Sequence, residues 1–348
     1  MTTLIATAIT AFVISFLLIP VIIKYSQEKN LMDIPGRRKI HKKLTPSLGG
    51  IAIFIGFGIA SLIWIEPNMW AEIRYVLIAQ AMIFFIGIRD DIVPLPPFTK
   101  LAGQIIAATI LISLMDLRLR SFHGILGIHE LPLWVSYTFT IFTIIVITNS
   151  FNLIDGLDGL AGLLAVISFL ALGTWYFLAG DMAFAALAFS MIGAVIGFLY
   201  FNWEPSKIFM GDTGALVIGI TLAIFVIRFI DAHVTMPVEH TVRFASAASA
   251  GVGVLMIPLA DTLRVFIIRI FRGQSPFTAD KSHIHHSLMR LGLSHSQAAL
   301  LLGFLQLAFI LLSIGLRNYA NAIALPALVL PAVILSISLD WMLRRKVA

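Results

Sequence analysis

Eleven long apolar segments are spread along this chain of 348 residues. A helix of about 20 apolar residues is long enough to cross a bilayer. The expected spans cover residues 3–23, 49–65, 73–88, 101–115, 132–148, 160–179, 183–200, 214–230, 244–267, 299–316 and 322–342. Strand-length segments of alternating hydropathy, which are typical of membrane β-barrels, do not occur in the sequence. We therefore expect an all-α integral membrane protein, a polytopic bundle of about 11 transmembrane helices formed by one domain, residues 1–348.

The overall composition agrees with this class of protein. Hydrophobic residues make up 59% of the chain and charged residues only 12%, whereas soluble domains have about 45–50% apolar and about 25% charged residues. The chain has no cysteine, which excludes disulfides and thiolate metal sites.

The distribution of positive charge predicts the orientation of the helices. No Lys or Arg precedes the first span, and seven follow it in residues 24–48, which argues against a cleaved signal peptide. With the N-terminus outside and the C-terminus inside, 17 of the 24 Lys and Arg residues fall in cytoplasmic segments, and five fall in outer segments or at the outer end of a span. Positive residues concentrate on the cytoplasmic side of membrane proteins, so we expect this N-out, C-in topology.

Three polar islands interrupt the apolar pattern, at residues 89–91, 149–158 and 209–212. An acidic residue at the centre of a membrane helix costs roughly 2.5–3.5 kcal/mol, so these groups are expected at a membrane face. In the topology above, all three islands fall on the cytoplasmic side. This shared location indicates one functional site.

The first two islands supply most of the carboxylates. Asp90 and Asp91 are adjacent and precede three prolines; on its own, such a pair could be part of a solvated loop. Asn152, Asp155 and Asp158 are spaced i, i+3, i+6 and would share one face of a helix. A simpler interpretation of this second island is a polar helix start, where the helix dipole favours acids.

The third island places Asp212 just before an apolar helix, and taken alone it could be an ordinary N-cap. Taken together, the converging carboxylates would need either protons or a cation. Oxygen ligands without cysteine suit Mg²⁺, with Mn²⁺ as the alternative. Mg²⁺ in proteins is usually bound by one or two carboxylates plus substrate phosphates, which favours a nucleotide-linked substrate.

Two basic segments are expected on the same side. The cluster His283-Ile284-His285-His286 could bind Zn²⁺, lie in a solvated loop, or recognise phosphate or sugar beside Lys281. In the first loop, Lys42 and Lys43 could attract anionic lipid in general or bind one lipid phosphate.

These motifs, taken in order, resemble those of a known enzyme family. The segments are residues 41–50 (HKKLTPSLGG), 90–91 (DD), 152–159 (NLIDGLDG), 209–212 (FMGD) and 283–286 (HIHH). Over essentially the whole chain, the sequence resembles the polyprenyl-phosphate N-acetylhexosamine-1-phosphate transferases, the superfamily of MraY, WecA and TagO. Ile284 interrupts the triple histidine typical of MraY, so the chain resembles the WecA and TagO branch.

The resemblance implies a membrane transferase with Mg²⁺ as cofactor. In this family a polyprenyl phosphate attacks a UDP-N-acetylhexosamine, and the products are a polyprenyl-diphosphate sugar and UMP. The branch implies UDP-GlcNAc as donor and undecaprenyl phosphate as acceptor, at the plasma (inner) membrane. The reaction would begin a cell-envelope glycan such as lipopolysaccharide or teichoic acid, and a homodimer is conceivable.

The resemblance also implies roles for individual residues. Asp212 is expected to bind the metal with help from Asp91, and Asp90 to assist the attacking lipid phosphate. Asp155 and Asp158 are expected to line the catalytic site. The substrate-binding residues implied are Asn152, Asn202, His283, His285, His286 and either Lys42 or Lys43.

Two other functions stay open at the level of sequence. One is the MraY reaction on UDP-MurNAc-pentapeptide, and the other is a cation-coupled secondary transporter. Transporters usually place acids near the bilayer midplane, whereas these acids lie in loops. Within the span at 244–267, Pro258 is expected to kink or break the helix, and Asp261 is expected either in the nucleotide pocket or paired with Arg264.

Overall fold

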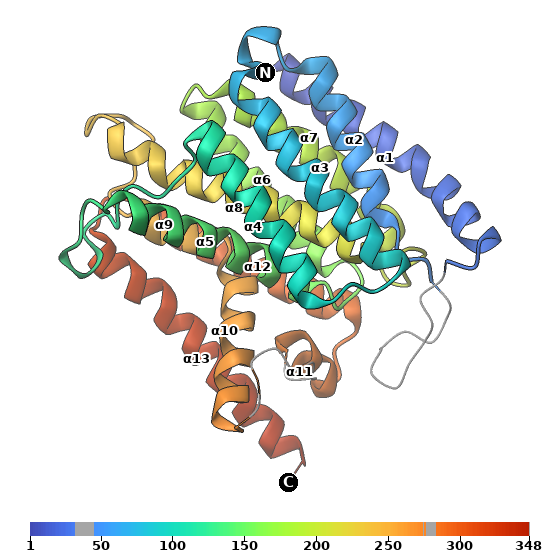
Figure 1. Cartoon of the computed structure of the whole chain (residues 1–348). Helices are drawn as coiled ribbons and strands as arrows, with labels where there is room; N and C mark the ends of the chain where they lie inside the picture. Colours follow the sequence, from blue (N-terminus) through green and yellow to red (C-terminus); the bar gives the residue numbers. More distant parts are fainter. Residues whose placement is uncertain (32–44, 274, 276–282, 348) are drawn as a thin grey trace.

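The computed structural model describes residues 1–31, 45–273, 275 and 283–347, and its regular structure there is helical (Figure 1). The α-helices are α1 (Thr2–Glu28), α2 (Gly49–Trp64), α3 (Trp70–Ile92), α4 (Pro97–Met115), α5 (Leu133–Ile154), α6 (Leu160–Leu178), α7 (Met182–Asn202), α8 (Gly211–Thr235), α9 (Ala247–Val254), α10 (Met256–Phe271), α11 (Ile284–Leu291), α12 (His295–Gly315) and α13 (Asn321–Val347). Two short 3-10 helices, η1 (Pro67–Met69) and η2 (Ile125–Gly127), lie in connections.

The expected all-α, multi-pass membrane architecture is confirmed. Each of the eleven expected spans coincides with helix. Within the described residues, nine helices are long and apolar enough to cross a membrane, and α9 with α10 would make a tenth if they form one broken span. The segment expected at 49–65 is α2, whose 16 residues are fewer than a full span needs. The direction in which the bundle faces stays a prediction.

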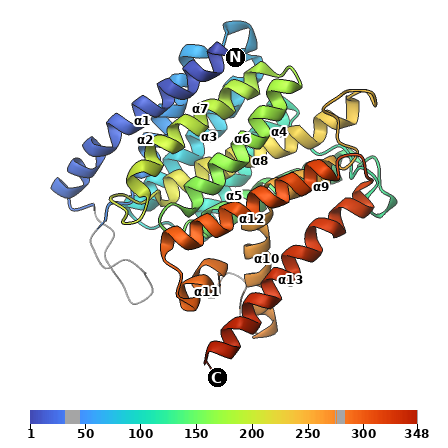
Figure 2. The same cartoon turned by 180° about the vertical axis from the view of Figure 1, so that it is seen from behind.

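Helix α8 lies at the centre of the bundle. It packs against α2, α3, α5, α6 and α9, while α1 covers α2 and α7 at one edge (Figures 1 and 2). Apart from Thr221, the sequence of α8 from Ala215 to Ile227 is apolar around the whole circumference of the helix, and a helix of this kind is stable when it is buried on every side. Its first residues, Gly211 and Asp212, are therefore held by neighbours on several sides.

The span expected to bend at Pro258 is broken three residues earlier. Helices α9 and α10 meet at Leu255 at an angle of 80°. Pro258 stands in the first turn of α10, where its missing N–H is tolerated. The buried side chain of Gln306, on α12, accepts a hydrogen bond from the N–H of Ile257 (3.0 Å) and donates to the carbonyl of Val254. Gln306 thus satisfies backbone groups that the break releases.

Beyond the break, α10 leaves the bundle beside α11 and the end of α13 (Figure 1). The ends of α3, α5 and α7 and the beginnings of α4, α6 and α8 come together at one end of the bundle, because successive helices run in opposite directions. The three polar islands occupy these connections. The fold therefore gathers at one end the residues that the sequence separates by more than 100 positions.

Candidate active site

The carboxylate of Asp91, at the end of α3, caps the first turn of α8. Asp91 Oδ1 accepts from the N–H of Asp212 at 2.8 Å. Asp91 Oδ2 accepts from the N–H of Thr213 at 3.0 Å and from its hydroxyl at 2.5 Å. The first N–H groups of a helix have no partner within the helix, and a carboxylate there is also favoured by the helix dipole. Asp91, rather than Asp212, therefore supplies the cap.

Gly211 allows this close approach of α3 and α8. Its φ of +71° favours glycine, and a Cβ at this position would collide with the carbonyl oxygen of Ser47. The chain before α2 runs directly against the third island: the N–H of Phe209 donates to Pro46, and that of Gly49 donates back to Phe209, at 2.8 and 3.0 Å. The first loop thus reaches the acidic site through residues next to the expected lysines.

Lys42 and Lys43, the predicted lipid-phosphate ligands, lie outside the described residues. Their roles stay predictions. The contact between Pro46 and Phe209 nevertheless fixes the described end of their loop beside the acidic site.

Lys100 joins two of the predicted site residues. Its Nζ lies 2.9 Å from Asp90 Oδ2 and 2.7 Å from Asp212 Oδ2. The other oxygen of Asp90 accepts from the N–H of Leu95 at 2.6 Å, so the turn after α3 is tied to the same carboxylate. Sequence reasoning did not select Lys100. Its position three residues after Pro97, in the first turn of an apolar helix and in the same loop as the Asp pair, was the available signal.

Asp155 follows the last residue of α5 and is the most strongly perturbed carboxyl outside the spans. Burial, together with the charges of Asp212, Asp91 and Asp158, raises the pKa of Asp155 to about 7. Because these interactions weaken with distance, they indicate that the three islands form one electrostatic unit.

The pKa of Asp158 is shifted in the opposite direction to that of Asp155. Burial opposes its ionisation, but His295 and the N–H of Ser206 lower the pKa of its carboxyl. Asp158 Oδ2 lies 3.4 Å from His295 Nδ1 and accepts from Ser206 at 3.3 Å. Glu204 accepts from the N–H of Ser296 at 2.8 Å. These contacts tie the start of α12 to the second island and to the connection between α7 and α8.

The two predicted asparagines have different surroundings. Asn202, which is buried, accepts from the N–H of Gly159 and donates to the carbonyl of Ile208, both at 2.9 Å. It therefore holds together the segments that follow α5 and α7. Asn152 stands in the last turn of α5 and is partly exposed. A substrate-binding role of either residue stays a prediction.

The histidine segment reaches the same site through Gly156. A Cβ on Gly156 would collide with the imidazole of His285, so this ring rests on the backbone beside Asp155. Burial lowers the pKa of His285 to about 3, and the neutral ring stacks on that of His283, with centroids 5.4 Å apart. The ring of His286 lies 4.5 Å from that of His285.

The structure also joins the histidine segment to α10. Asp261 Oδ2 lies 2.8 Å from His283 Nδ1. Across the described ranges, Asp261, His283 and His285 are a group of ligand-type side chains whose ligand atoms lie within 4.8 Å of one another. The Zn²⁺ interpretation of the motif therefore has a candidate geometry, although it stays untested. Arg264, expected as a partner of Asp261, donates to Asp340 on α13.

The residues present are chemically suited to a divalent cation. Five carboxylates meet at this end of the bundle, and in the part of the chain that the structure describes, Lys100 and His295 are the cationic or ionisable groups bonded to them. The carboxylates are Asp90, Asp91, Asp155, Asp158 and Asp212. Burial and, after it, the negative charges of Asp212, Asp91 and Asp158 raise the pKa of Asp155, and hard oxygen donors suit Mg²⁺.

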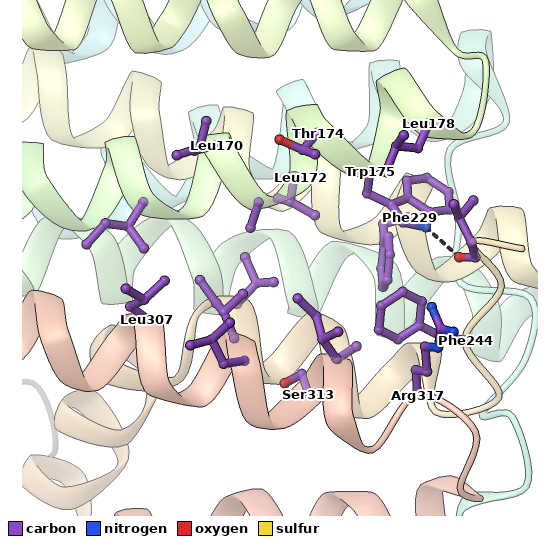
Figure 3. Close-up of a pocket in the computed structure, with 18 residues that line it drawn as sticks. Leu170, Leu172, Thr174, Trp175, Leu178, Phe229, Phe244, Leu307, Ser313 and Arg317 are labelled. Carbon is purple, nitrogen blue, oxygen red and sulfur yellow. Dashed lines mark hydrogen bonds between the residues drawn. The ribbon is translucent and has the colours of Figure 1, made fainter.

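A separate cavity of about 460 Å³ lies toward the opposite ends of the helices (Figure 3). Its lining is almost entirely apolar. It includes Leu178, the last residue of α6, Phe229, in the second half of α8, and Arg317, which follows α12. Trp175 borders this cavity and donates to the carbonyl of Val242 at 2.8 Å. The acidic site stands at the other ends of α6, α8 and α12, so this cavity does not contribute to it.

Comparison with known proteins gives the family. The model of glycosyl transferase family 4 matches residues 73–230. A Bacillus subtilis protein, named as a probable undecaprenyl-phosphate N-acetylglucosaminyl 1-phosphate transferase, is 32% identical over 318 residues, which cover 89% of this chain and 85% of that protein. The chain belongs to the polyprenyl-phosphate N-acetylhexosamine-1-phosphate transferases, within glycosyl transferase family 4.

Two other members of this transferase family have a similar sequence identity to this chain. The undecaprenyl-phosphate alpha-N-acetylglucosaminyl 1-phosphate transferase of Haemophilus influenzae is 34% identical over 79% of the chain and 76% of its own length. The decaprenyl-phosphate N-acetylglucosaminephosphotransferase of Mycolicibacterium smegmatis is 31% identical over 77% of the chain and 71% of its own length. The family resemblance expected from the motifs is thus confirmed, and these transferases carry N-acetylglucosamine names, as expected for the branch.

Proposed function

We propose that this protein transfers GlcNAc-1-phosphate from UDP-GlcNAc to undecaprenyl phosphate, with UMP as the second product. The observation that carries the proposal is the convergence of Asp91, Asp155 and the Lys100-bound pair Asp90 and Asp212 at one end of a membrane-helix bundle. Relatives whose names specify this transfer support the choice of sugar and lipid. The reaction would be the first membrane step of a cell-envelope glycan.

In the reaction, an oxygen of the lipid phosphate forms a bond to the β-phosphorus of the donor. The bond between that phosphorus and the UMP oxygen breaks, and UMP leaves with the electron pair. The difficulty is to bring two anions together, so positioning and charge neutralisation dominate catalysis of phosphoryl transfer. Lys100 supplies one fixed positive charge at the acidic site.

Individual residues have distinct proposed tasks. Asp90, bonded to Lys100 and Leu95, faces the lipid phosphate and assists it as an acceptor of its proton. Asp212 and Asp91 would hold Mg²⁺, which supplies neutralisation of the diphosphate when bound. Asp91 also keeps Asp212 in place, since its carboxylate accepts from the N–H of that residue.

The remaining proposed contacts involve the donor and the lipid. Asp155 and Asp158 line the donor site, and the substrate contacts are Asn152, Asn202, His283, His285, His286 and Lys42 or Lys43. We place the protein in the plasma membrane with the acidic site toward the cytoplasm. The excess of Lys and Arg in the segments at that end supports this orientation.

A donor screen tests this function. Purified protein, undecaprenyl phosphate and Mg²⁺ are incubated with UDP-GlcNAc, UDP-GalNAc or UDP-MurNAc-pentapeptide, and UMP release is measured. We expect release mainly from UDP-GlcNAc, its loss on chelation with EDTA, and no turnover by Asp212→Ala. Asp116→Ala, which removes an acid at the opposite end of α4, is the control and should remain active.

Each other outcome of the screen has a clear meaning. Release from UDP-MurNAc-pentapeptide alone would assign the MraY reaction. The absence of UMP with every donor would contradict the transferase function and favour a transporter.

A further inference from the structure

Asp261 is a buried acid on α10, a helix that leaves the bundle. It is only 1% exposed. A buried carboxylate is costly unless it is fully hydrogen-bonded. Its partners therefore indicate its task.

Both oxygens of Asp261 are bonded to the histidine segment. Oδ2 lies 2.8 Å from Nδ1 of His283, and Oδ1 accepts from the N–H of Ile284 at 2.7 Å. Ile284 is the first residue of α11, so one oxygen satisfies an unpaired helix N–H. A neutral Ser, Thr or Asn side chain would serve as well for that purpose. The second oxygen has a separate role, because it is hydrogen-bonded to the ring of His283.

The bond to Nδ1 determines how His283 can act. When a carboxylate accepts Nδ1–H, it fixes both the tautomer and the orientation of the ring. Nε2 is then the ring nitrogen that remains for another partner. The His283 side chain is 7% exposed, so its ring has little freedom to find a different orientation.

The other side of the segment is fixed by the second island. The ring of His283 stacks on that of His285 with an interplanar angle of 13°, and His285 rests on Gly156 beside Asp155. Asp261 and Gly156 therefore hold the two stacked rings between α10 and the acidic site. A shift of Asp261 would change the position of His283 relative to the site.

We propose that Asp261 is a positioning residue, which holds His283 so that Nε2 meets the diphosphate of the nucleotide-sugar donor. This role rests on the proposed function. Asp261 itself touches neither substrate nor reacting atoms; it acts through His283.

A double-mutant cycle tests the proposal. The variants are Asp261→Asn, which keeps the size and one acceptor, His283→Ala, and the two combined. We expect Asp261→Asn to lower kcat on the order of 10- to 100-fold, the range found for carboxylates that orient metal-bound histidines, with KM for the UDP-sugar changed less than about 3-fold. Because Asp261 acts through His283, the combined variant should be no slower than His283→Ala alone.

Asp340→Asn is the matched control. It removes the acid that accepts a hydrogen bond from Arg264, one turn along α10, and should leave kcat within about 3-fold of the parent protein, as expected for a charge outside the site. Losses that multiply in the combined variant would contradict the proposal, because Asp261 would then act independently of His283. A loss confined to KM would also contradict it.

Two measurements separate this inference from the proposed function. In ¹⁵N-histidine NMR spectra, the signal that disappears in His283→Ala should report a protonated Nδ1, and Asp261→Asn should change it whether or not any donor is turned over. An unchanged His283 signal would overturn the positioning role. Stoichiometric Zn²⁺ in the purified protein, lost in His285→Ala, would also overturn it, since the three side chains would then be metal ligands.

Discussion

At the scale of single residues, Lys100 stands out because one cation contacts two carboxylates from different helices. Asp90 belongs to α3 and Asp212 to α8, and the Lys100 side chain, on α4, is 24% exposed between them. Two like charges about 4 Å apart repel by roughly 4 kcal/mol at an effective dielectric of 20. Lys100 thus stabilises the acidic pair, and in the proposed reaction it also offers positive charge to a phosphate.

Lys100→Met should therefore reduce turnover strongly. Loss of one preorganised charge or donor typically lowers kcat by about 10²- to 10³-fold, and the same loss is expected in the UMP-release assay. Lys24→Met, which changes an exposed lysine on α1, is the matched control and should retain parental turnover. Normal activity of Lys100→Met would show that Lys100 does not contribute to catalysis.

At the scale of elements, the ends of helices carry the site, and neighbouring helices hold them. The first turn of α8 is capped by Asp91 from α3. The break between α9 and α10 is held by Gln306 from α12. This break directs α10 out of the bundle, and Asp261 on α10 in turn contacts the histidine segment. A single buried amide therefore supports the placement of a distant motif.

Gln306→Met should destabilise the protein while conserving side-chain length. The buried N–H of Ile257 would lose its partner, and an unsatisfied buried group of this kind costs about 1–3 kcal/mol. The carbonyl of Val254 would keep its hydrogen bond from the hydroxyl of Ser168. We expect a lower thermal-unfolding midpoint in detergent. Gln27→Met, at an exposed position near the end of α1, should leave the midpoint unchanged. Equal midpoints for the two variants would mean that Gln306 does not hold the break.

At the scale of the whole molecule, the bundle brings five carboxylates together at one end. The carboxylates come from the ends of α3 and α5, the connection before α6 and the beginning of α8. The pKa of Asp155 is sensitive to these carboxylates, since burial and the charges of the other acids raise it to about 7. Its folded state binds a proton more tightly than its unfolded state. Stability contributed by Asp155 is therefore fully present below the unfolded pKa and is lost as pH rises toward about 7.

Asp155→Asn should accordingly stabilise the metal-free protein at pH 8 while it lowers activity. The variant removes a charge that the folded state tolerates poorly, and each kcal/mol relieved should raise the midpoint by roughly 2–4 °C. The gain should shrink as pH falls below about 7, where the parent carboxyl becomes protonated. Thermal unfolding in EDTA between pH 5 and pH 8 measures it. A gain that does not depend on pH would contradict the electrostatic explanation.

The sequence by itself determined the class of fold and the location of the polar islands. Lipid-length apolar runs specify membrane helices because the bilayer requires internally bonded backbone, and each expected span was found as helix. The motifs also identified the family, because their order along the chain is specific. The same reasoning placed the helix break at Pro258 instead of Leu255, since helix ends depend on neighbouring side chains such as Gln306.

Only the tertiary structure decided which groups meet. Asp91 caps α8 across 121 residues of sequence, Lys100 reaches Asp212 across 112, and Asp261 bonds His283 from another helix. Local patterns indicate which side chains are too polar for lipid, but they do not specify partners. Those partners are set by the packing of antiparallel helices around α8, which brings distant helix ends within hydrogen-bonding distance.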